Sequence, residues 1–161
     1  MISLHTQGGN RFQKNLVNVT VSWCLQKMMP RIRKLDLQFH LKNIKDADGF
    51  CLNDSADQED FGPNRSPRRF CIEIKKSLHL TDMVSTIIHE MEHVRQYVMK
   101  ELEDTNTHAR WKTRKYAFDH DYWKQPWEKM AYAKQEKYIM ECLAEAVFDP
   151  DPDQNGYTKH P

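Results

Sequence analysis

Hydrophobic periodicity divides the first half of the chain into one helix and three strands. Apolar positions at helical spacing predict a helix from Phe12 to Met29, although the β-branched residues in its first half leave a strand open as an alternative. Strict alternation predicts strands at 35–41 and 70–76, and a shorter strand is expected at 49–52. The intervening stretch 53–67, rich in Asp, Pro, Asn and Ser, predicts a polar loop.

Two longer helices are expected in the second half. The first spans 81–103 with Thr81 as its N-cap, because no Gly or Pro interrupts it and apolar residues recur every three or four positions: Val84, Ile87, Ile88, Met91, Val94, Val98 and Leu102. The second spans 126–148, since Pro126 suits the first turn of a helix and good helix formers follow it. This order predicts an α+β fold with an N-terminal helix, a small three-stranded sheet and two C-terminal helices.

The length and composition indicate one domain. A chain of 161 residues with 39% hydrophobic content is long enough to bury a core. We expect a loose N-terminus at 1–10, a domain at 11–148 and an unstructured acidic tail at 149–161.

The most informative pattern is His-Glu-Met-Glu-His at positions 89–93. In a helix, His89 and His93 lie one turn apart on the same face, so both imidazoles can bind one metal ion while Glu90 approaches a water molecule on it. This is the arrangement of zinc hydrolases. The alternative is an amphipathic core helix that carries two incidental histidines.

A catalytic zinc ion normally takes a third protein ligand. The metzincin pattern is excluded because Gln96 and Met99 occupy the positions that it requires. Two candidates remain, namely Glu128 in the first turn of helix 126–148 and His108 in the polar connection between the helices. Glu128 is favoured because a packed helix holds a ligand more rigidly than a loop does. Its alternative role is to stabilise the positive end of the helix dipole.

Segments 81–97 and 122–132 resemble the small zinc metallopeptidases common in phage genomes, which are SprT-like in outline but carry a gluzincin-type Glu as third ligand. The resemblance covers roughly residues 35–145. It implies a minimal zincin-like domain, with His89, His93 and Glu128 holding one zinc ion per chain and Glu90 as general base. One departure is Lys129-Met130, where the family pattern has an acidic residue.

The predicted function is hydrolysis of peptide bonds by metal-activated water, with Glu90 as general base. Tyr122, close to Glu128 in the sequence, is the candidate donor of a hydrogen bond to the oxyanion of the intermediate. One alternative changes the target to peptidoglycan or to proteins linked to DNA. The other is a non-catalytic zinc-binding inhibitor or assembly protein, which would not need Glu90 as a base.

Charge and hydropathy limit the kinds of partner that we expect. A net charge of +1 gives no overall attraction to nucleic acid. Four basic residues around Trp111 could contact nucleic acid, but a solvated connector is the favoured interpretation: Arg110, Lys112, Arg114 and Lys115. No apolar stretch reaches the length of a membrane span and no signal peptide is recognisable, so a cytoplasmic protein without a membrane partner is expected.

The cysteines lie far apart in the sequence, with no Cys-x-x-Cys pair: Cys24, Cys51, Cys71 and Cys142. Neither a zinc ribbon nor a local redox motif is therefore present. We expect four buried, reduced thiols.

Overall fold

The computed structural model describes residues 1–54, 66–105 and 107–148. The fold of this part is α+β, as predicted, with helices and strands in the order β1 (Ile2–Gln7), α1 (Arg11–Met28), β2 (Leu35–Lys42), β3 (Gly49–Asn53), β4 (Arg69–Lys75), α2 (Leu80–Val98), β5 (Leu102–Asp104), β6 (Ala109–Trp111), β7 (Arg114–Tyr116), the 3-10 turn η1 (Tyr122–Lys124), α3 (Pro126–Cys142) and the π-helical turn η2 (Leu143–Val147).

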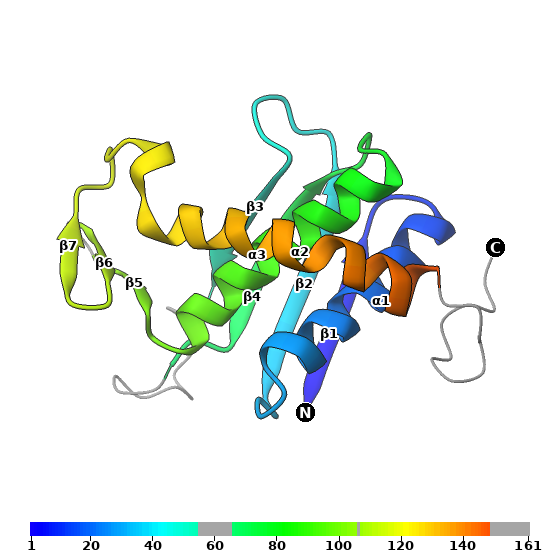
Figure 1. Cartoon of the computed structure of the whole chain (residues 1–161), viewed down its shortest axis with the longest axis horizontal. Helices are drawn as coiled ribbons and strands as arrows, with labels where there is room; N and C mark the ends of the chain where they lie inside the picture. Colours follow the sequence, from blue (N-terminus) through cyan, green and yellow to red (C-terminus); the bar gives the residue numbers. More distant parts are fainter. Residues whose placement is uncertain (55–65, 106, 149–161) are drawn as a thin grey trace.

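The main sheet has the strand order β1-β2-β4-β3. Strands β1, β2 and β4 are parallel, and β3 runs antiparallel to β4 at the edge. Alternate residues of β2 and β4 are buried, as the strict alternation predicts. The helices gather on one face of this sheet, and α3 lies across α2 (Figure 1). The two elements that carry the predicted ligands therefore pack directly against each other.

The prediction of a loose N-terminus at residues 1–10 is wrong, because Ile2–Gln7 forms β1, which pairs with residues 35–40 of β2. The sheet consequently has four strands where three were predicted. The strand was missed because Ile2 and Leu4 are its only apolar residues of any size, and its hydrogen-bonding partner lies more than thirty residues along the chain. The predicted tail 149–161 and most of the predicted loop 53–67 lie outside the described residues.

Helix α2 is shorter than predicted. It begins at Leu80 with His79 at the N-cap and no side-chain cap, so Thr81 lies in the first turn and the predicted cap is wrong. It ends at Val98, because Lys100 adopts a left-handed backbone with φ of 58° and Glu101 N donates to the carbonyl of Gln96 over 2.9 Å. No glycine marks this stop in the sequence.

The connection between α2 and α3, predicted as a polar linker, forms a three-stranded antiparallel sheet of β5, β6 and β7. Trp111 and Tyr116 of this sheet contact Trp127 at the start of α3, with ring centroids 6.4 and 5.4 Å apart. The small sheet therefore supports the first turn of α3, where Glu128 lies. Helical structure continues through η2 to Val147, close to the predicted end at 148.

Two further predictions concern the cysteines and membrane-spanning helices. The four cysteines are free, as predicted. Cys24 and Cys142 are also buried, but the prediction of burial is wrong for Cys51 and Cys71, which are partly exposed. Within the described ranges, none of the helices combines the length and the apolar character that crossing a membrane requires.

Candidate metal centre

Helices α2 and α3 bring the three predicted ligands together. The Oε1 atom of Glu128 lies 2.9 Å from Nε2 of His89 and 3.0 Å from Nε2 of His93. All three side chains are buried, and their ligand atoms lie within 4.8 Å of one another. Ala131, one turn after Glu128, is fully buried and allows the two helices to approach closely.

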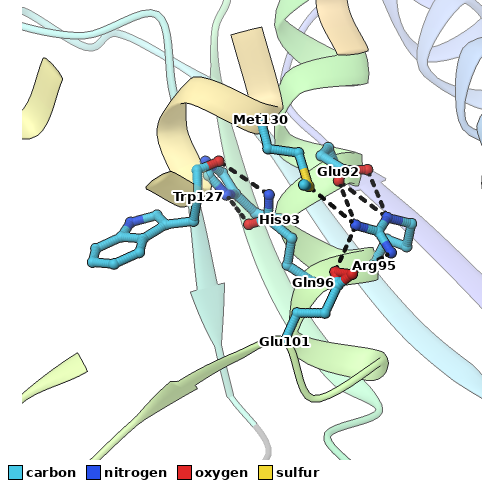
Figure 2. Close-up of polar contacts among 7 residues, drawn as sticks. All are labelled: Glu92, His93, Arg95, Gln96, Glu101, Trp127 and Met130. Atoms are coloured by element: carbon cyan, nitrogen blue, oxygen red, sulfur yellow. Dashed lines mark hydrogen bonds and ion pairs between the residues drawn. The ribbon is translucent and has the colours of Figure 1, made fainter. Parts of the chain in front are cut away.

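Gln96 fixes the orientation of the His93 ring (Figure 2). Its Nε2 group donates to the carbonyl oxygen of Trp127 over 3.0 Å, so its Oε1 atom must be the one that faces His93 Nδ1, also at 3.0 Å. Because a carbonyl oxygen can only accept, His93 carries a proton on Nδ1. The other ring nitrogen, Nε2, therefore faces Glu128.

Gln135 acts in the same way on the other imidazole. Its Oε1 atom lies 3.1 Å from Nδ1 of His89, which leaves Nε2 of His89 directed at Glu128. Two imidazole nitrogens and a carboxylate oxygen thus converge in a buried space. Three lone pairs at such distances would repel one another, so a proton or a metal ion must lie between the nitrogens and the carboxylate oxygen.

This donor set fits a metal ion. Ligand atoms about 2.0–2.1 Å from a tetrahedral zinc ion lie about 3.3 Å apart, so the observed separations of 2.9 and 3.0 Å need to widen by only a few tenths of an ångström. Each imidazole has the second hydrogen bond that metal-ligating histidines use to hold their tautomer. The group of His89, His93 and Glu128 could therefore hold a metal ion.

The electrostatics of the ligands point the same way. Burial alone would raise the pKa of Glu128, but the hydrogen bonds from His89 and His93 outweigh it and lower the pKa to about 2. Burial also opposes the charged form of His93, yet the hydrogen bond to Glu128 and the nearby carboxylate of Glu90 raise its pKa to about 9. The site therefore attracts a positive charge strongly, whether that charge is a proton or a metal ion.

Glu90 lies beside the ligands and has a different environment. Its side chain is only 4% exposed, and within the described residues it accepts no hydrogen bond. Burial raises its pKa, opposed in part by the two histidines. A Cβ atom at Gly49 would come within 3.3 Å of Oε1 of Glu90, so the start of β3 passes directly over this carboxylate.

Tyr122 also lies at the site. Its hydroxyl donates to Oε1 of Glu128 over 3.0 Å and lies 3.2 Å from the hydroxyl of Tyr132. Burial, the bond to Tyr132 and the charge of Glu128 raise the pKa of Tyr122, which keeps its proton available for donation. Tyr132 lies one turn after Glu128 on the same face of α3. Its ring packs edge-on against His89, with ring centroids 4.5 Å apart.

A cleft of about 760 Å³ opens above the three ligands. One wall consists of residues 46–51, from the β2–β3 connection into β3, and the other of aromatic residues from η1 and α3. Glu90, His89, His93 and Glu128 line its floor. A substrate in this cleft would meet the ligand group and Glu90 together.

The rival third ligand is not at the site. His108 lies in the turn between β5 and β6, where its Nδ1 atom contacts the hydroxyls of Thr105 and Thr107. It does not belong to the His-His-Glu group. Glu128 is thus the third residue that the fold places with His89 and His93.

The basic run lies on the hairpin of β6 and β7. Arg110 forms an ion pair with Glu103 of β5, and Lys112 lies over the ring of Trp111, 5.4 Å from its centroid. Two members of the run therefore have partners within the small sheet. Lys112 occupies the turn with a positive φ of 55°.

Sequence reasoning missed the supporting role of the amides. Gln96 was noted only because it breaks the metzincin pattern, yet its spacing of three from His93 already places both on one helix face. The family pattern has an acidic residue where this chain has Lys129-Met130. In this structure Gln135 contacts His89 instead. The second half of the interaction, the carbonyl of Trp127, depends on helix packing and leaves no signal in the sequence.

Comparison of the chain with models of protein families, with curated proteins and with solved structures finds no match. The interpretation of the site therefore depends on its own geometry and chemistry. That geometry is a buried His-His-Glu group beside Glu90, which has no hydrogen-bonding partner in the described part of the chain.

Proposed function

We propose that the protein is a zinc-dependent metallopeptidase in which His89, His93 and Glu128 hold the ion and Glu90 is the general base. The observation that carries this proposal is the carboxylate of Glu90, buried beside the ligands without a hydrogen-bonding partner in the described chain. Two imidazoles and one carboxylate form a ligand set typical of catalytic zinc. A closed structural site would have no use for a buried unpaired carboxylate, which is costly to maintain.

The roles of the side chains follow from their positions. A bound zinc ion supplies a water molecule of lowered pKa and polarises the substrate carbonyl. Glu90 accepts a proton as water attacks, and its raised pKa favours return of that proton to the leaving amine. Tyr122, with its hydroxyl already directed at Glu128, is placed to donate a hydrogen bond to the oxyanion.

The edge of the sheet supports a peptide as the substrate. Strand β3 pairs with β4 on one side, and in the described part of the chain its other side has no strand neighbour. Residues 49–51 of β3 line the cleft. An extended peptide can hydrogen-bond to such an edge and thereby present its carbonyl groups to the floor of the cleft.

The test compares Glu90→Gln with a matched exchange, Glu141→Gln. Glu141 lies near the C-terminal end of α3, pairs with Lys27 and is outside the cleft. Both proteins are loaded with zinc and incubated with a peptide library whose products are identified by mass spectrometry. We expect Glu90→Gln to keep its zinc and its melting temperature but to lose activity by a factor on the order of 100 or more. The Glu141→Gln protein should match the parent.

Two results would contradict the proposal. If Glu90→Gln cleaves peptides as fast as the parent, Glu90 is not the base. If the zinc-loaded parent cleaves no member of the library, the non-catalytic alternative takes precedence.

A further inference from the structure

The cleft above the ligands differs from the rest of the protein in its charge. Lys and Arg together number 24 in the chain, against 23 for Asp and Glu. No Lys or Arg lines the cleft within the described residues, but four carboxylates do: Asp46, Asp48, Glu90 and Glu128. A divalent ion bound to the three ligands would neutralise two of these charges, which leaves two net negative charges in the cleft. A cleft of one sign attracts substrates of the opposite sign.

Glu128 pairs with His89 and His93, but the other three carboxylates form no ion pair with the described residues. Glu90 is 4% exposed, faces the cleft and has no hydrogen-bonding partner among the described residues. Asp46 and Asp48 lie exposed on the rim, and neither forms an ion pair with the described part of the chain. An unpaired buried carboxylate and two unpaired rim carboxylates in one cleft indicate that a positive group binds there.

The backbone next to Asp48 lies close to the reacting centre. Asp48 directly precedes Gly49, and a Cβ atom at Gly49 would lie 3.3 Å from Oε1 of Glu90. A side chain held by Asp48 therefore belongs to a residue next to the bond that Glu90 helps to cleave, or one position farther away.

The opposite wall suits the long side chain of a basic residue. Trp123 is 68% exposed and stacks on Tyr132, with ring centroids 5.5 Å apart and planes at 25°. Tyr122 meets both rings edge-on. Aromatic faces attract cations, and the aliphatic stem of Lys or Arg packs on them while the charged end stays in water.

We propose that the cleft selects peptides that carry Lys or Arg next to the scissile bond, with Asp46 and Asp48 as specificity-determining residues opposite Trp123. This proposal rests on the proposed peptidase function and names its substrate class. Asp46 and Asp48 recognise the charge, and the aromatic wall contacts the stem of the side chain.

The experiment uses the zinc-loaded full chain and short peptides that differ only in one position, occupied by Lys, Gln or Glu and moved along the peptide. At the best position we expect kcat/KM for Lys to exceed that for Gln by about 3- to 10-fold, because exposed ion pairs are individually weak, and Glu to be the poorest. The double variant Asp46→Asn/Asp48→Asn should bring the Lys-to-Gln ratio close to one. High salt should have a similar effect on the parent.

The matched control is Asp82→Asn, since Asp82 is exposed in the first turn of α2 and outside the cleft. This variant should keep the parent's rate and ratio. A Lys-to-Gln ratio near one in the parent, or an unchanged ratio in the double variant, would overturn the substrate class while the peptidase function stands.

Peptide binding to zinc-loaded Glu90→Gln separates this failure from that of the proposed function. Binding is measured by fluorescence anisotropy of labelled peptides, so it needs no turnover. If the parent hydrolyses nothing but the Lys peptide binds more tightly than its Glu counterpart, the peptidase function fails and the cation preference stands. Equal binding of the Lys and Glu peptides, or binding of neither, would overturn the preference.

Discussion

Replacing Gln96 by Met tests whether the amide holds the metal site in its binding geometry. The exchange keeps the length and burial of the side chain but removes both of its hydrogen bonds, to His93 Nδ1 and to the Trp127 carbonyl. Because Gln96 is fully buried, the N–H and C=O groups that remain have no water to replace it. Each unsatisfied group costs about 1–3 kcal/mol, and loss of a partner behind a ligating imidazole weakens metal binding about 10- to 100-fold.

The assay measures zinc affinity and stability separately. Competition with a chromogenic chelator gives the dissociation constant, and denaturant unfolding of the chelated protein gives the free energy of unfolding. Gln96→Glu is informative beside Gln96→Met, because its carboxylate still accepts from His93 but faces the Trp127 carbonyl without a proton to donate. We expect Gln96→Glu to bind zinc at least as tightly as the parent, although its unfolding free energy falls.

Gln13→Met is the matched control. Gln13 accepts from Asn10 N and donates to the Lys76 carbonyl, so the same exchange again removes two hydrogen bonds, at the start of α1 and away from the ligands. It should reduce stability modestly and leave zinc affinity unchanged. Zinc affinity in Gln96→Met within twofold of the parent would refute the reasoning, since the tautomer of His93 would then not depend on the amide.

Three other outcomes are expected. Glu128→Ala should weaken zinc binding by a factor on the order of 100, whereas His108→Ala should stay within a fewfold, as chelator competition would measure. Arg95→Met should lower the free energy of unfolding by about 3 kcal/mol in urea titrations, because Glu92 is fully buried and would lose its partner. The proton on His93, whose pKa is about 9, must leave before zinc binds. Calorimetry in buffers of different ionisation enthalpy should therefore show release of about one proton near pH 7, and affinity should rise about tenfold per pH unit up to about pH 9 and level off above it.

The sequence predicted the site better than it predicted the sheet. His89 and His93 follow from helical spacing, and Glu128 from the combination of Pro126 with a long run of helix formers; the structure places all three together. Periodicity works here because α2 and α3 each extend over several turns with one buried face. Local pattern alone could thus orient both ligand-bearing helices.

The parts that were missed depend on partners distant in sequence or on local backbone strain. Strands β5, β6 and β7 have three residues each, too few for alternation to be recognised, and they are held by Trp111 packing against Trp127. The end of α2 depends on a left-handed lysine, Lys100, where a sequence signal would be a glycine. β1 exists because its backbone pairs with β2, which composition does not reveal.

The two glutamates of the His-Glu-Met-Glu-His motif show what the fold adds to the sequence. Both are buried on α2, two residues apart. Glu92 is fully buried and receives several hydrogen bonds from Arg95, which also pairs with Glu101, so its charge is neutralised within the protein (Figure 2). Glu90 has no such partner among the residues that the structure describes, and it faces the cleft. Because a buried carboxylate is costly unless it is paired or used, the pairing of Glu92 assigns it to stability, and the isolation of Glu90 beside the ligands favours it as the base.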